Sequence, residues 1–275
     1  MTLPSDYHMH TPLCRHASGE PIEYAARAVA LGLTEIGFSD HNPMPDDDFD
    51  DWRMRLDQLD AYVEAVGRAR RQQPQLRILL ALEVDFLPGC EDWVRELAGR
   101  HPWDYFIGSV HYLNREWDID NPKKLARWDA CDRWEVWSTY TDLLRQAAAS
   151  GLFEIIGHCD LCKKFGHRPD RDPTPLFQPF LRTAAEQGVA IELNTAGLRK
   201  ECREIYPAPS ILRLAHEEGV AITFGSDAHA PEEVGADFAA ALELARSVGY
   251  GETVRFEQRQ RTLVPLPSAG TERSG

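Results

Sequence analysis

Residues 77–86 read R-I-L-L-A-L-E-V-D-F, an apolar run that gives way to carboxylates at Glu83 and Asp85. A longer amphipathic stretch follows at 92–100. A short apolar or β-branched run followed by an amphipathic stretch predicts a strand and then a helix. The two carboxylates therefore lie near the end of a predicted strand.

The same alternation recurs along all 275 residues, without an internal sequence repeat. It predicts strands at 7–10, 35–39, 77–86, 105–111, 154–157, 189–193 and 221–225. It predicts helices at 21–31, 52–71, 92–100, 128–149, 175–187, 208–218 and 232–248. Consecutive strand–helix units predict a parallel sheet with right-handed crossovers, either a TIM-like barrel or an open doubly wound sheet. No G-x-G-x-x-G or Walker loop follows a strand, which weakens the nucleotide-binding open sheet.

Composition excludes several functional classes. The net charge of −14 would repel a phosphate backbone, so we expect no nucleic-acid partner. No apolar run is long enough to span a membrane, and the start M-T-L-P-S-D does not resemble a signal peptide, so we expect a cytoplasmic protein. The six cysteines are irregularly spaced and are expected to be reduced; C-D-L-C at 159–162 has no second pair near it for a zinc site.

Side chains able to bind metal ions stand at the carboxyl ends of six of the seven predicted strands, and Asn194 stands at the remaining one. They are His8 and His10, Asp40 and His41, Glu83 and Asp85, His111, His158 and Asp160, and Asp227 and His229. In a barrel these strand ends converge on one face, where catalytic loops gather. Scattered core histidines would not all occupy the same end of their strands, so the pattern predicts a shared metal site.

The spacing of the first histidines fits this interpretation. His8 and His10 are two residues apart on a strand and point to the same face, about 6.7 Å apart. Metal–nitrogen bonds of about 2.1 Å let both rings bind one ion, while His16 in the following loop is in reach of a second. Glu83 and Asp227 are candidates to bridge two cations. Asp85 and Asp160 are equally suited to orient a neighbouring imidazole.

Six ordered motifs resemble the polymerase-and-histidinol-phosphatase (PHP) superfamily of metal-dependent phosphoesterases. They are H-M-H at 8–10, F-S-D-H at 38–41, L-E-V-D at 82–85, G-S-V-H-Y at 108–112, G-H-C-D at 157–160 and G-S-D-A-H at 225–229. Further stretches resemble the monofunctional histidinol-phosphatases within it: K-K-F-G-H-R-P at 163–169, N-T-A-G-L-R-K at 194–200 and I-Y-P-A-P at 205–209.

This resemblance implies one domain over residues 1–264, a distorted TIM-like (β/α)7 barrel with a trinuclear site at the carboxyl ends of its strands. One ion would be held by His8, His10, Glu83 and Asp227, a second by Glu83, His111 and His158, and a third by His16, His41 and His229. The divalent ions would be zinc, iron or manganese, among which mixed histidine and carboxylate ligands do not choose. The Pro/Ser/Gly-rich stretch 265–275 is expected to be a flexible tail.

The implied activity is hydrolysis of L-histidinol phosphate to L-histidinol and phosphate, in histidine biosynthesis, by a metal-activated water. Arg199, just after the sixth strand, is placed to bind the phosphate through paired hydrogen bonds. Further candidates for that role are Lys163, Lys164 and Arg168. Asp40 or Asp160 is the candidate to protonate the leaving group or orient water. Asp85 or Asp118 is the candidate to receive the amine and imidazole of the substrate.

Two alternatives remain open at this point. One is another PHP-type phosphoesterase, acting on a small phosphomonoester or a nucleotide; the charge of −14 disfavours a nuclease. The other is a non-catalytic metal-binding protein, which would bind ions without turnover. An arginine suited to phosphate beside the ligand set favours catalysis. The sequence makes no prediction of oligomeric state.

Overall fold

The computed structural model describes residues 2–268 and contains a parallel six-stranded sheet in the order β1-β2-β3-β6-β7-β8. Its strands are β1 Glu35–His41, β2 Arg77–Asp85, β3 Tyr105–Ser109, β6 Ile155–Ile156, β7 Ala190–Asn194 and β8 Ile222–Gly225. The helices are α1 Pro21–Ala30, which precedes β1, and α2 Leu59–Gln72, α3 Glu91–Ala98, α4 Ala126–Asp129, α5 Arg133–Ala149, α6 Gln178–Gln187, α7 Pro209–Glu217 and α8 Phe238–Val248.

The N-terminal segment 6–10 joins the two edges of this sheet. On one side Asp6 and Met9 accept backbone hydrogen bonds from β1, and on the other Tyr7 donates to Phe224 of β8. The segment was predicted as a strand, but it makes only isolated bridges, to Ile36 and to Ala228. It therefore occupies the seventh strand position and connects the edges of a curled sheet.

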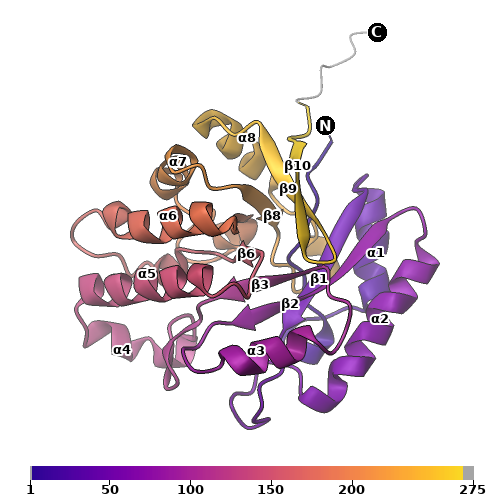
Figure 1. Cartoon of the computed structure of the whole chain (residues 1–275), viewed down its shortest axis with the longest axis horizontal. Helices are drawn as coiled ribbons and strands as arrows, with labels where there is room; N and C mark the ends of the chain where they lie inside the picture. The colour runs from indigo at the N-terminus through magenta and orange to yellow at the C-terminus, as the bar shows by residue number, and fades with distance from the viewer. Residues whose placement is uncertain (1, 269–275) are drawn as a thin grey trace.

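Helices lie around the outside of the curved sheet (Figure 1). The prediction of a distorted TIM-like barrel is confirmed, and the open doubly wound sheet is not the fold. In the described part of the chain, none of the helices is long and apolar enough to cross a membrane.

The alternation of side chains along each strand determines which residues face the barrel axis. In β2, Leu79 and Ala81 belong to the interior apolar cluster, while Leu80 and Leu82 pack in the larger cluster beneath the helices. Because side chains on a strand alternate between faces, Glu83 follows Leu79 and Ala81 on the interior face. The apolar core thus fills one end of the barrel, and the carboxylate stands above it at the other.

Two hairpins were not predicted. The first pairs β4 Tyr112–Asn114 with β5 Trp117–Asp118, and the second pairs β9 Glu252–Glu257 with β10 Gln260–Pro265. In β9, Val254 and Phe256 belong to the interior cluster, so this hairpin closes the end of the barrel away from Glu83. Pro265, the first residue of the predicted tail, ends β10, and residues 269–275 of that tail lie outside the described residues.

The bounds of three predicted helices differ substantially in the structure. The helix expected at 232–248 begins only at Phe238, after a separate 3-10 turn at Pro231–Glu233. The helix expected at 52–71 begins only at Leu59, because Trp52 and Arg53 belong to a loop in which the Arg53 guanidinium is buried against Asp50 and Asp85. The helix expected at 128–149 is divided into α4 and α5. The Asp132 side chain accepts a hydrogen bond from the backbone N–H of Trp134 and so caps the start of α5.

Candidate metal centre

The centre of the site is the carboxylate of Glu83, which is 1 % exposed and accepts a 2.6 Å hydrogen bond from Ser109. Five imidazoles approach its two oxygens from the barrel wall. The nitrogen–oxygen distances are 3.3 Å for His8, 3.6 Å for His10, 2.9 Å for His41, 3.5 Å for His111 and 2.9 Å for His158. The ends of the parallel strands thus place imidazoles from distant parts of the chain next to one carboxylate.

Two compact groups of possible ligands lie on either side of Glu83. One consists of His8, His10 and Asp227, and the other of Glu83, His111 and His158; within each group the candidate ligand atoms lie within 4.8 Å of one another. Asp227 is held with a positive φ of 51° and places Oδ1 3.2 Å from Nε2 of His10. The second group is the set that the family resemblance implied for one ion. The first is the set implied for another ion without Glu83, whose Oε2 lies 3.3 Å from Nε2 of His8.

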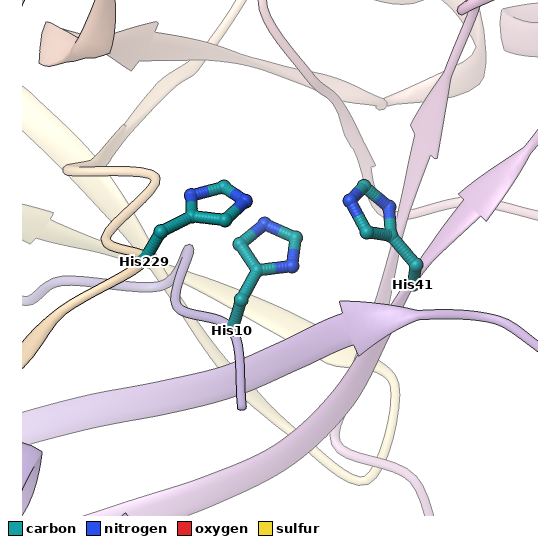
Figure 2. Close-up of side chains that lie close together, drawn as sticks. All are labelled: His10, His41 and His229. Carbon is teal, nitrogen blue, oxygen red and sulfur yellow. The ribbon is translucent and has the colours of Figure 1, made fainter. Parts of the chain in front are cut away.

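The third implied group is arranged differently. His16 and His229 meet with their Nε2 atoms 2.9 Å apart, but His41 lies with its Nδ1 beside Glu83. Candidate ligand atoms of His10, His41 and His229 lie within 4.8 Å of one another, and Figure 2 shows their rings converging from three segments. Cys14, which sequence reasoning did not single out, forms a further such group with His16 and His229.

Electrostatics favour the metal-binding protonation state at Glu83, His41 and His229, but not at every ligand. At His10 and His111 burial lowers the pKa, but neighbouring carboxylates outweigh burial and raise the pKa to about 9 and about 10, so a cation would displace a proton from each ring. Burial opposes ionisation of Glu83, yet neighbouring imidazoles, His8 first among them, outweigh it and hold the pKa of this carboxyl well below its usual range. Burial also holds the pKa values of His41 and His229 well below the usual value for imidazole, and both rings are therefore neutral at pH 7. A neutral imidazole offers a lone pair to a cation.

Unsatisfied nitrogen atoms show that the cluster fits cations. Nε2 of His8, Nε2 of His10 and Nδ1 of His41 are buried. Carboxylate oxygens lie 3.3, 3.2 and 2.9 Å from them, but none of the three forms a hydrogen bond of suitable geometry among the described residues. Leaving such atoms unsatisfied costs roughly 1–3 kcal/mol each, and buried polar atoms in proteins are rarely left so. Divalent cations with imidazole and carboxylate ligands would satisfy all three.

Comparison with known proteins identifies the family. The PHP domain matches residues 6–196, and the PHP-associated family matches residues 210–238. The chain belongs to the PHP domain family. This PHP domain is 46 % identical over 262 residues to a protein of Deinococcus radiodurans named probable histidinol-phosphatase, covering 94 % of this chain and 99 % of the relative.

Two further relatives cover nearly their whole lengths. The histidinol-phosphatase of Bacillus subtilis is 30 % identical over 264 residues, covering 86 % of this chain and 98 % of the relative. The structure of a histidinol phosphate phosphatase of Lactococcus lactis, complexed with zinc, L-histidinol and phosphate, matches with a TM-score of 0.81. It covers 95 % of this chain and 100 % of its own at 20 % identity, which supports the fold of the PHP domain.

The two aspartates predicted as proton donors do not line the cavity of this PHP domain. Asp40 is fully buried, accepts from the backbone N–H groups of Thr11 and His41, and lies 3.4 Å from Nδ1 of His10. Asp160 is fully buried, 2.8 Å from the ammonium of Lys163, and accepts from the backbone of Ala208. Both carboxylates bind neighbouring groups, and a role in proton transfer stays a prediction for these two residues.

The predicted phosphate-binding cations differ in whether they line the cavity. Lys163 is fully buried between Asp160 and Glu204, and Arg168 pairs with the same Glu204, so neither lines the cavity. Lys164 does line it and pairs with Asp120 at 2.9 Å.

Arg199 lies at the edge of the cluster of ligands. Its Nη2 donates to the carbonyl of Ser226 at 2.8 Å, and its Nε lies 3.2 Å from Glu233 Oε1. Its Nη1 is buried and has no partner among residues 2–268. Arg199 is not among the residues that line the cavity over the cluster.

A cavity of about 430 Å³ opens over the cluster and is lined by residues from several loops. Asp118 lines it, whereas Asp85 is buried behind it against His111. Sequence reasoning missed Trp52, whose ring stands edge-on to those of His41 and His111 at 4.6 and 5.4 Å. It also missed five charged lining residues, Asp51, Asp120, Lys123, Lys200 and Glu233.

Proposed function

We propose that this chain hydrolyses L-histidinol phosphate to L-histidinol and phosphate, acting as a single domain over residues 1–264 in the cytoplasm. The observation that carries the proposal is the set of imidazoles around Glu83 at the floor of the cavity. Such a cluster suits phosphoryl transfer, in which developing charge must be neutralised and water must be activated. The identity of the substrate rests on relatives named histidinol-phosphatase, two of which align with almost their entire length.

The residues that would hold the metal ions are those that surround Glu83. We assign one ion to His8, His10, Glu83 and Asp227, a second to Glu83, His111 and His158, and a third to His16, His41 and His229, as the family resemblance implies. The chemistry supplied by bound zinc, iron or manganese would be charge neutralisation at the phosphoryl oxygens and acidification of a water molecule. Candidate ligand atoms of His10 also lie within 4.8 Å of those of His41 and His229, which supports close packing of the first and third groups.

The chain's own cations then bind the phosphate. The Arg199 Nη1 atom is buried and has no protein partner among the described residues, and we assign it to the phosphate although Arg199 is not one of the residues that line the cavity. Lys164 and Lys200 line the cavity, and no carboxylate of residues 2–268 lies within ion-pair distance of Lys200. A guanidinium and an ammonium at one site bind a dianion through charge-assisted hydrogen bonds.

The other end of the substrate carries an amine and an imidazole. The cavity wall contains carboxylates of opposite charge at Asp118 and Glu233, together with the ring of Trp52. Asp118 already accepts from Asn121 Nδ2 at 2.7 Å and pairs with Lys124, so it is held in a fixed orientation. A fixed carboxylate binds a cationic group at little entropic cost.

A phosphate-release assay tests the substrate. The value of kcat/KM for L-histidinol phosphate should exceed those for O-phosphoserine and p-nitrophenyl phosphate by about 100-fold or more, because a site built for polar groups rejects analogues that lack them. Equal rates on all three would identify a general PHP-type phosphoesterase. Bound metal without turnover of any phosphoester would identify a non-catalytic metal-binding protein.

Arg199→Ala tests the phosphate site. The variant should lower kcat/KM by about 10- to 1,000-fold, the range expected for loss of a charge-assisted contact in the transition state. The matched control is Arg182→Ala, which removes a 59 % exposed arginine that pairs with Glu218. An unchanged kcat/KM in Arg199→Ala would remove Arg199 from the phosphate site.

A further inference from the structure

A buried carboxylate that the proposed mechanism does not use lies beneath the cluster. Glu192 is 1 % exposed and stands in β7 between Ala190 and Asn194, on the interior face of the barrel. Its Oε1 lies 2.7 Å from Nδ1 of His8. Its Oε2 accepts hydrogen bonds from the backbone N–H of His158 at 3.1 Å and from Nδ2 of Asn194 at 3.0 Å.

No lysine or arginine balances this carboxylate. Among residues 2–268 its only ion-pair partner is His8, and the exposed fractions of the two side chains are 1 % and 0 %. A buried charge without a counter-ion is costly, so a further positive charge is expected close by. The free Nε2 of His8, on the far side of the same ring, faces Glu83 at 3.3 Å.

The close approach of Glu192 to His8 requires a glycine at position 225. A Cβ added to Gly225 would lie 1.8 Å from Oε1 of Glu192 and 2.6 Å from Cβ of His8. A side chain at position 225 would therefore displace the Glu192 carboxylate from the His8 imidazole. Asn194 links Glu192 to a further candidate ligand, because its Nδ2 also lies 3.3 Å from Oδ2 of Asp227.

We propose that Glu192 is a positioning residue of the metal centre. It accepts a hydrogen bond from Nδ1–H of His8 and so directs Nε2 to the cation held with His10 and Asp227. Its unbalanced charge also raises the affinity for that cation. A carboxylate behind a ligating histidine fixes its tautomer and makes it a stronger donor. The same side chain orders the backbone at His158, which belongs to the second group of ligands. The inference rests on the proposed metal centre but not on the identity of the substrate.

Zinc affinity measured by competition with a chromophoric chelator tests the role without any substrate. Loss of such a carboxylate typically weakens metal binding by about 10- to 100-fold, and we expect Glu192→Ala to fall in this range. Glu192→Gln should weaken binding less, because its amide oxygen still accepts the Nδ1 proton of His8. Glu154→Gln is the matched control: it neutralises a mostly buried carboxylate that pairs with Arg259, away from the cluster, and should keep wild-type affinity.

Gly225→Ala provides an independent variant that keeps the charge of Glu192 and displaces its side chain. It should weaken zinc binding as Glu192→Ala does. Folding is checked for each variant by far-UV circular dichroism, and Glu192→Gln, which is nearly isosteric, keeps the test available if Glu192→Ala does not fold.

Wild-type zinc affinity and stoichiometry in folded Glu192→Gln and Gly225→Ala would overturn the inference. A wild-type chain that binds no zinc would instead overturn the metal centre itself, and with it this role. A chain that binds zinc normally but does not turn over histidinol phosphate would refute only the proposed substrate.

Discussion

Arg53 and His111 are joined through a single carboxylate. Nη2 of Arg53 donates to Oδ2 of Asp85 at 2.8 Å, and Oδ1 of Asp85 lies 2.8 Å from Nδ1 of His111. The guanidinium also lies over the ring of Trp52, 4.3 Å from its centroid, and donates to the carbonyl of Asn42 at 3.0 Å. One buried arginine therefore fixes both the loop that forms a wall of the cavity and an imidazole of the metal centre.

Arg53→Met should strongly destabilise the fold, because Asp85 and Asp50 would then lack their buried cation. Breaking a buried pair by removing one partner costs about 3–5 kcal/mol in the free energy of unfolding, which urea denaturation measures. The control Arg71→Met removes an exposed partner of Glu64 and should change that free energy by no more than about 0.5 kcal/mol. Equal changes in the free energy of unfolding for the two substitutions would show that the ion pairs of Arg53 do not stabilise the fold.

Removal of metal ions should lower both activity and thermal stability. The chelated protein keeps a buried cluster of carboxylates and imidazoles in which several ring nitrogen atoms have no hydrogen-bond partner among the described residues. A ligand at 100 times its Kd stabilises the folded state by about 2.7 kcal/mol, so Tm should fall on chelation and recover when zinc, manganese or ferrous iron is returned. Full activity and an unchanged Tm in metal-free protein would refute the metal mechanism.

Much of the fold could be predicted because it depends on local patterns. Continuous apolar runs such as 78–82 mark buried parallel strands, and the polar residue that ends each run marks the face where the site forms. The same reasoning extends to Glu192, an acidic residue inside the apolar run 189–193 and two residues before Asn194. Because Glu192 and Asn194 are two residues apart, they face the same side of the strand, which predicts an inward-facing carboxylate. This signal was not used.

The roles of charged loop residues could not be predicted in the same way. Lys163 and Lys164 are adjacent in the sequence, yet the first is fully buried against Glu204 and the second lines the cavity. The difference depends on partners about 40 residues away, which a local pattern does not contain. Trp52 was placed in a helix for a similar reason, since the pairing of Arg53 with Asp85 that holds its loop is a tertiary contact.

Substituting these two neighbouring lysines should give opposite results. Lys163→Met leaves the buried Asp160 without its cation and should lower the free energy of unfolding by about 3–5 kcal/mol. Lys164→Met removes a cavity cation and should raise KM or lower kcat for the phosphoester, with a smaller loss of stability because its pair with Asp120 is partly exposed. Steady-state kinetics and urea denaturation of both variants distinguish the two roles. A larger catalytic effect from Lys163→Met would contradict the assignment.

The pH dependence of stability should reveal the carboxylate at the closed end of the barrel. Burial of Glu35 raises its pKa, but Arg255, Tyr7 and Arg77 outweigh burial and hold the pKa of this carboxyl below its usual value. A lowered folded-state pKa gives stability that is present above the unfolded pKa of about 4.3 and is lost as pH falls through the folded value.

Glu35→Gln isolates this contribution. The difference in free energy of unfolding between wild type and Glu35→Gln should be constant from about pH 7 to 5 and should shrink below about pH 4.3, as the wild-type carboxyl takes up a proton. All other carboxylates titrate alike in the two proteins and cancel in the difference. Glu96→Gln, which breaks an exposed pair with Arg100, should show a difference near zero throughout. Because Glu35 lies at the end of β1 opposite His41, kcat should not change, and a difference that widens toward acid pH would refute the lowered pKa.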